Sequence, residues 1–157
     1  MTQEEKQLLL TDLCARLPYG VKVENTSFLE PQIHTLFGRV SDDEFLMLET
    51  YKSVGGEDYR IVTDDVHYTG YLERIKPYLR PISSMTEEEK AEMSEGSKLA
   101  FLPAFEGKDG YCTDTMAYCA FNIDFCLKHH LDYRGLIEKG LALESPEGRI
   151  YKEAPSN

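Results

Sequence analysis

Residues 75–90 read IKPYLRPISSMTEEEK, and this stretch separates two parts of the chain that have different patterns. Pro77 and Pro81 bracket an apolar pair, and a proline limits any helix here to a turn or two. Thr86 and Glu89 stand at the Thr-x-x-Glu spacing of a capping box, which predicts that a helix begins there. We therefore expect a structural waist, an extended or turn-like connection between a strand-rich front half and a helix-rich back half.

The front half predicts one helix followed by a meander of strands. Thr2 and Glu5 form another capping box, and leucines then recur at helical spacing, so we expect a helix over residues 3–16. Alternating apolar and polar residues, separated by turn residues, predict about four short strands after it. The first of these strands is expected to start at Val21, and the others are expected over residues 33–40, 45–51 and 59–63. An antiparallel sheet of this kind has one face to cover, and the first helix is the available cover.

The back half predicts two helices. The capping box at Thr86 opens a short acidic helix to about Glu95, and the glycines and proline of residues 96–110 indicate a loop. A longer helix is expected over residues 113–131, and it should cover the sheet together with the first helix. Residues 132–144 should pack back against the rest of the chain, because their leucines and isoleucine need burial.

These elements predict a single α+β domain over residues 1–157. A small antiparallel sheet of about four strands would pack against the N-terminal helix and the longer helix of the back half. The sequence leaves open a sheet that is curled into a partly closed barrel. The expected parts are residues 1–74 for the first helix and the strands, 75–90 for the waist, 91–150 for the helical part and 151–157 for a frayed tail.

The charge of the chain restricts the class of partner. Its 157 residues include 17 basic and 28 acidic groups, which give a formal net charge of −11. Binding to nucleic-acid phosphates or to an anionic membrane surface needs grouped Lys and Arg, which the chain lacks. We therefore expect neither direct nucleic-acid binding nor membrane binding. An acidic surface keeps a protein in solution, and it can also bind a basic partner or imitate nucleic acid.

The compartment expected from the sequence is the cytoplasm. The chain opens on an acidic helix start, whereas a secretory signal has a basic segment followed by an apolar run. No apolar stretch approaches the length of a membrane span. The four cysteines are therefore expected to be reduced thiols.

The sharpest chemical candidate is a stripe of cysteine and histidine in the longer helix. Cys112, Cys119 and Cys126 recur every seven residues, which returns each of them to nearly the same face of a helix. Cys126 and His130 stand at i and i+4, a spacing that can hold a metal ion between two turns. Ile123 shares the stripe and indicates a core face, where free cysteine acts as a small hydrophobic residue. We therefore expect no metal, no cofactor and no catalytic residue, and Cys126 and His130 are the nearest candidates for a metal site.

Aromatic residues in loops are the second candidate feature. Tyrosine and arginine are favoured at the energetic centres of protein interfaces. Tyrosine rings also commonly fill the gap where a loop crosses a core. The candidate interaction residues are Tyr68, Tyr71, Tyr78, Tyr133 and Arg134.

Two parts of the chain resemble a known group of proteins. The first is IKPYLRP at residues 75–81 with SSMTEEE at residues 83–89, and the second is HHLDYRGLI at residues 129–137 with GLALE at residues 140–144. Both are similar to a family of small uncharacterised proteins of gut anaerobic bacteria and their phages or other mobile elements. The resemblance implies cytoplasmic expression and a mobile-element context, and it brings no activity, cofactor or catalytic residue.

The function favoured by the sequence is that of a non-enzymatic interaction protein, an accessory factor that binds another protein. The acidic surface, the aromatic loops and the lack of a familiar catalytic motif in the sequence point to it. The alternative is an enzyme or metal-binding protein that uses Cys126 and His130, with Asp132 or Glu138 assisting. A further alternative is an acidic nucleic-acid mimic, which needs carboxylates spaced like phosphates along one face.

Overall fold

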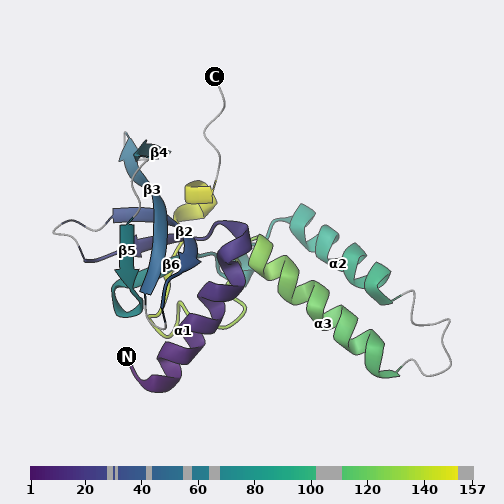
Figure 1. The fold of residues 1–157 in the computed structure, drawn as a ribbon. Coiled ribbons are helices and arrows are strands. Elements are labelled where there is room, and N and C mark those ends of the chain that lie inside the picture. The colour runs from purple at the N-terminus through teal and green to yellow at the C-terminus, as the bar shows by residue number, and fades with distance from the viewer. Residues whose placement is uncertain are drawn as a thin grey trace.

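The structure is a computed structural model. A sheet and the first helix form a body, and a pair of helices projects from it (Figure 1). The α+β class predicted from the sequence is confirmed. The described residues are 1–27, 30, 32–41, 44–54, 58–63, 68–101 and 111–151.

Three long helices and a set of strands make up the described part of the chain. The helices are α1 (Gln3–Arg16), α2 (Glu87–Phe101) and α3 (Tyr111–Lys128). The strands are β1 (Lys22–Asn25), β2 (Gln32–Arg39), β3 (Glu44–Val54), β4 (Asp58–Thr63), β5 (Tyr68–Tyr71), β6 (Ile75–Leu79) and β7 (Leu143–Glu144). Short 3-10 helices lie at Leu17–Tyr19, Leu72–Arg74, Ile82–Ser84 and Pro146–Tyr151.

The strands form one mixed sheet in the order β4-β3-β2-β1-β6-β7, and β5 pairs with the first part of β3. Every pairing is antiparallel except that of β6 with β7. The four expected strands correspond to β1–β4, so the predicted sheet was too small. Within the residues that the structure describes, no pairing joins the two ends of this order, and the sheet is not closed into a barrel.

Strand β6 accounts for much of the difference, because it occupies the first residues of the expected waist. It lies between β1 and β7, with Pro77 opposite Val23 and with Leu79 fully buried. Proline donates no backbone hydrogen bond and is unusual inside a sheet, so the local sequence favoured a turn. The connection between the sheet and the helices is consequently confined to residues 80–86.

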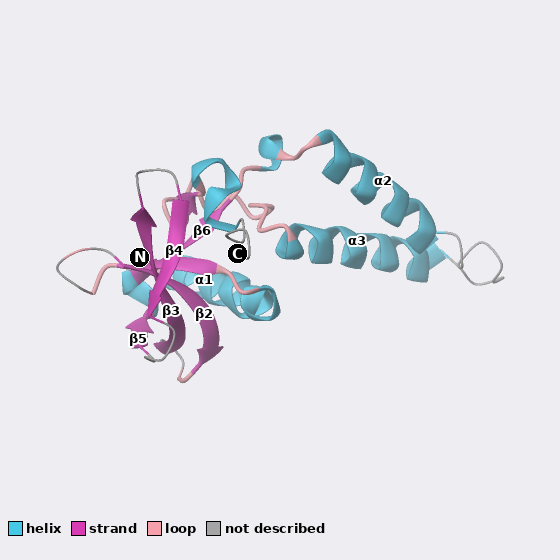
Figure 2. Ribbon diagram, turned by 90° about the horizontal axis from the view of Figure 1, so that it is seen from above, coloured by secondary structure: helices cyan, strands magenta, loops and turns pink. Residues whose placement is uncertain are grey.

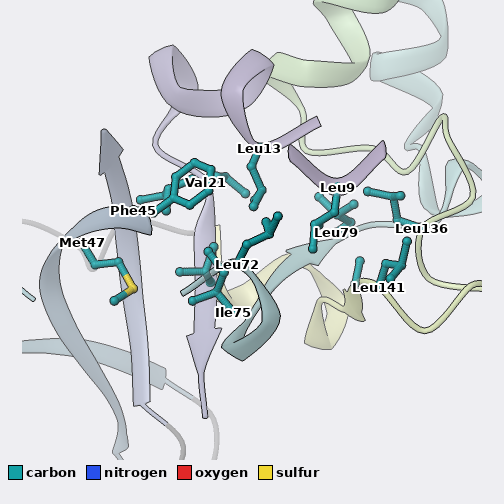
Figure 3. Close-up of a cluster of buried hydrophobic side chains, with 13 residues drawn as sticks. Leu9, Leu13, Val21, Phe45, Met47, Leu72, Ile75, Leu79, Leu136 and Leu141 are labelled. Carbon is teal, nitrogen blue, oxygen red and sulfur yellow. The ribbon is translucent and has the colours of Figure 1, made fainter. Parts of the chain in front are cut away.

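Helix α1 covers one face of the sheet, and local signals set its ends. The capping box is present, since the Thr2 amide donates to Glu5 Oε2 at 2.7 Å and the Glu5 amide donates to Thr2 Oγ1 at 3.2 Å. Leu9 and Leu13 point from α1 into the main core (Figure 3). Gly20 ends the following 3-10 turn at a φ of 63°, a left-handed conformation that glycine adopts without a steric penalty.

The segment after α3 closes the main core, as predicted for residues 132–144. Leu136 and Leu141 are buried beside α1 and β6 (Figure 3). Both carboxylate oxygens of Asp132 hold the turn by accepting hydrogen bonds from the amides of Leu136 and Ile137, at 2.8 and 2.9 Å. The other buried members of this core are Val21, Val23, Leu36, Phe45, Met47, Leu72, Ile75, Leu79 and Ala142.

Helices α2 and α3 form an antiparallel hairpin that extends away from the body (Figures 1 and 2). The prediction that the helix of residues 113–131 covers the sheet is therefore wrong. Its apolar side packs against α2 so closely that a Cβ atom on Gly96 would lie 1.9 Å from Cζ of Phe121. α2 also continues to Phe101, into the loop predicted at 96–110, and the rest of that loop lies outside the described residues.

The C-terminal part of the chain is held as far as Tyr151. The hydroxyl of Tyr151 donates to the carbonyl oxygen of Tyr78 at 2.5 Å and accepts a hydrogen bond from the Lys22 amide at 3.2 Å. The tail was expected to fray over residues 151–157, but Tyr151 is held in place, and residues 152–157 lie outside the described residues. None of the described helices is both long and apolar enough to cross a membrane.

Candidate protein-interaction site

Helix α3 carries apolar side chains that no other described element covers. Phe121 faces α2, and at about 100 degrees per residue Cys119 and Ile123 lie on the opposite side of the helix. Cys119 is exposed, and Ile123 keeps 43% of its surface exposed. Tyr118 on one flank is also 43% exposed. We call the exposed residues Ala117, Tyr118, Cys119, Ala120 and Ile123 the α3 patch.

The α3 patch continues a stripe that is buried at the other end of the same helix. Cys126 and Leu127 are only 6% and 7% exposed, because the body covers the last turn of α3. The sequence predicted that the stripe of Cys119, Ile123, Cys126 and His130 is a core face. The structure confirms this for Cys126 and His130 and corrects it for Cys119 and Ile123, which are exposed.

The hairpin is joined to the body by an ionic cluster at its base. Arg80 donates to both carboxylate oxygens of Glu89, at 2.7 and 2.9 Å. Glu89 also completes the capping box of α2 by accepting from the Thr86 amide at 2.9 Å. His129 directly follows the last residue of α3, and its Nδ1 lies 3.2 Å from Glu89 Oε1. One carboxylate therefore connects the sheet side, the start of α2 and the end of α3.

The charge of Glu89 should make the hairpin base sensitive to acid. Arg80 is the largest cause that holds the pKa of Glu89 down, from 4.5 to about 2. A carboxyl group with a lowered pKa stabilises the folded state above pH 4.5, and this contribution disappears as the pH falls toward 2. We expect Glu89→Gln to cost about 2 kcal/mol in the free energy of unfolding at pH 7, and about zero near pH 2.

Urea denaturation of both proteins across this pH range measures the difference. Glu87→Gln is the matched control, because Glu87 is in the same first turn and its side chain is 86% exposed. Equal losses for the two variants at pH 7 would contradict the role assigned to Glu89.

A second link between α1 and the end of the hairpin is fully buried. Arg16 Nε donates to Asp12 Oδ2 at 2.6 Å, and Arg16 Nη2 donates to the carbonyl oxygen of Leu131 at 2.8 Å. Arg134 adds a longer contact, with Nε 3.4 Å from Asp12 Oδ1. Arg134 also donates to the Tyr133 hydroxyl at 2.9 Å. These groups fix the residues that leave α3 against the body.

The predicted metal candidates Cys126 and His130 form the end of α3. The Leu131 amide donates to the Cys126 carbonyl oxygen and the His130 amide to that of Leu127, the two bonds of a Schellman motif. His130 occupies the left-handed position of this motif, with a φ of 54°. This position is usually glycine, so His130 adopts the conformation at a steric cost.

The surroundings of Cys126 and His130 are those of a core. The ring of His130 stacks on Tyr151 with ring centroids 3.7 Å apart. Burial, with the charge of Arg16 as the second cause, lowers the pKa of His130 to about 3. Burial likewise raises the pKa of the Cys126 thiol. In the described part of the chain, no three His, Cys, Asp or Glu side chains gather as they would around a metal ion.

The predicted interaction residues do not form one surface. Tyr71 is 59% exposed on strand β5, whereas Tyr68 is half-buried with its ring centroid 5.1 Å from that of His34. Tyr78 is buried, and its hydroxyl donates to Glu24 Oε2 at 2.8 Å.

Tyr133 and Arg134 are both half-buried and lie in the cluster around Asp12 and Arg16. The sequence did not predict that the residues of the α3 patch are exposed. The available signal was that α3 has apolar residues on more sides than one neighbour can cover.

Comparisons with protein-family models, with curated proteins and with solved structures find no match to this chain. The function is therefore argued from the side chains and their arrangement.

Proposed function

We propose that this chain is a non-enzymatic interaction protein that binds another protein through the α3 patch. The observation that carries the proposal is Ile123, an aliphatic side chain 43% exposed on a helix that projects beyond its own core. Tyr118 and Cys119 are exposed beside it. Exposed apolar residues that cluster on one element mark surfaces that another molecule covers.

The construction of the hairpin supports this proposal. The ion pair of Arg80 with Glu89 and the hydrogen bond from Arg16 to the Leu131 carbonyl oxygen hold its base to the body. A rigidly mounted helix loses little conformational freedom when it binds, and this favours affinity. The α3 patch would thus be presented to a partner in a fixed orientation.

Substitution of Ile123 tests the proposal. We expect Ile123→Glu to reduce the amount of partner protein retained from host lysate by at least about tenfold, because a charge replaces an apolar contact at the centre of the patch. Val40→Glu is the matched control, since Val40 is 57% exposed and directly follows β2, outside the α2–α3 hairpin. The measurement is quantitative mass spectrometry of material bound to each immobilised protein.

Two results would contradict the proposal. One is that Ile123→Glu and Val40→Glu retain the same proteins in the same amounts as the unsubstituted chain. The other is that the chain retains no protein at all and instead turns over a small molecule.

A further inference from the structure

We infer that the partner of the α3 patch is a basic amphipathic helix, which lies along the hairpin between the apolar side of α3 and a row of glutamates on α2. This inference rests on the proposed function and adds the chemistry of the partner to it. It follows from the charges that border the patch and from the size of the side chains within it.

The acidic row lies on α2. Glu88, Glu92 and Glu95 stand at i, i+4 and i+7, so they share one side of the helix, and all three are exposed. α2 as a whole contains five glutamates and two lysines. This side of α2 therefore carries three carboxylates, of which Glu92 is paired with Lys128 of α3.

A contact between the two helices shows which side of α3 adjoins the acidic row. Lys128 Nζ lies 3.4 Å from Glu92 Oε1. Around the axis of α3, Ala117 and Asp124 lie within about 40 degrees of Lys128, and Ala120 lies about 80 degrees from it. The alanines of the α3 patch thus face the same side of the hairpin as the glutamates. Asp124 also lies on this side, where its carboxylate accepts a hydrogen bond from the Tyr19 hydroxyl.

The shape of this side suits another helix. Ala117, Ala120 and Ile123 recur every three residues and form a ridge of the kind that packs between the side chains of a neighbouring helix. Small residues in such a ridge allow an interaxial distance of about 8 Å. A helix lying there would pack over Ala120 and against the near edge of Ile123, and its flank would reach Glu92 and Glu95.

The flank of the partner must then be basic. Lysine or arginine beside Glu92 and Glu95 gives electrostatic complementarity, whereas an acidic flank would be repelled. A second copy of this chain matches poorly, because each copy has a net charge of −11 and an acidic row beside the same ridge. The charge pattern thus selects a basic helix of another protein over self-association.

The test uses the full chain and a synthetic probe. The probe is a fluorescent peptide as long as α3, with leucine at helical spacing and lysine at the other positions, and fluorescence anisotropy measures its binding. A second peptide has glutamate in place of every lysine. We expect saturable binding of the lysine peptide by a monomeric protein and no binding of the glutamate peptide.

Two pairs of variants separate the partner chemistry from the proposed function. Ile123→Glu should weaken binding of the lysine peptide at least about tenfold, and Glu92→Gln with Glu95→Gln should weaken it at least about fivefold. Glu4→Gln with Glu138→Gln changes the net charge equally at exposed positions outside α2 and α3, and it should change binding less than twofold. Circular dichroism confirms that each variant is folded.

The outcomes are distinguishable. If only Ile123→Glu weakens binding, the α3 patch binds proteins but the basic partner is wrong. Equal losses for the two glutamine pairs would overturn the inference, because binding would then depend on total charge alone. A dimer in light scattering that Ile123→Glu dissociates would also overturn it, in favour of a second copy. No binding of the lysine peptide by the unsubstituted chain would overturn it as well, while host-lysate binding would still decide the proposed function.

Discussion

Replacement of Arg16 by alanine is expected to lower the free energy of unfolding by about 3–5 kcal/mol. Arg16 and Asp12 are both fully buried, and Arg16 Nε lies 2.6 Å from Asp12 Oδ2. The substitution therefore leaves a buried carboxylate without its main partner. It also removes the donor to the Leu131 carbonyl oxygen. Arg134 remains near Asp12, at 3.4 Å, and this contact limits the loss. Urea denaturation followed by circular dichroism measures it.

The double variant Asp12→Leu with Arg16→Met separates the charge from the packing. It removes both buried charges and leaves apolar side chains in their place, so most of the stability lost in Arg16→Ala should return. A loss below about 1 kcal/mol for Arg16→Ala would show that Arg16 does not link α1 to the end of the hairpin.

Replacement of Phe125 by alanine is expected to destabilise the hairpin by a similar amount, about 3–5 kcal/mol. Phe125 is 3% exposed at the base of the hairpin, with its ring stacked on His129 at 4.2 Å and 6.3 Å from the ring of Phe121. The cavity would lie between the α2–α3 pair and the body. Hydrogen exchange should therefore accelerate in α2 and α3 more than in β1 and β6.

Ile123→Ala is the matched control for Phe125→Ala. Both positions are in α3, but Ile123 is 43% exposed and should lose less than about 1 kcal/mol. A loss at Ile123 as large as that at Phe125 would mean that the patch is part of the folded core, and it would contradict the site proposed here.

Local signals explain which parts of the fold the sequence predicts well. The Thr2–Glu5 capping box and the leucines after it define α1, and alternation defines β1–β4. The strands that were missed depend on distant partners. β6 contains Pro77 and is completed by β7, whose Leu143 pairs with Tyr78 from far along the chain. No pattern within either segment specifies this pairing.

The site shows a different limit of sequence reasoning. Periodicity identifies the apolar sides of α3, but it does not show where the body ends beneath the helix. Cys126 and Ile123 are less than a turn apart on one stripe, and only Cys126 is buried. The tyrosine prediction has the same limit, because Tyr71 and Tyr78 differ in exposure only through tertiary packing.

The rate of alkylation of Cys119 is the most direct measurement of the proposed interaction. Cys119 is exposed within the α3 patch, whereas Cys14 is half-buried in α1 and serves as the internal reference. Iodoacetamide labelling followed by mass spectrometry gives both rates, in the free protein and in the complex formed with host lysate. We expect the complex to slow labelling of Cys119 at least about tenfold, because a covered interface excludes solvent, and to leave labelling of Cys14 unchanged. Equal labelling of Cys119 in the free protein and in the complex would contradict it.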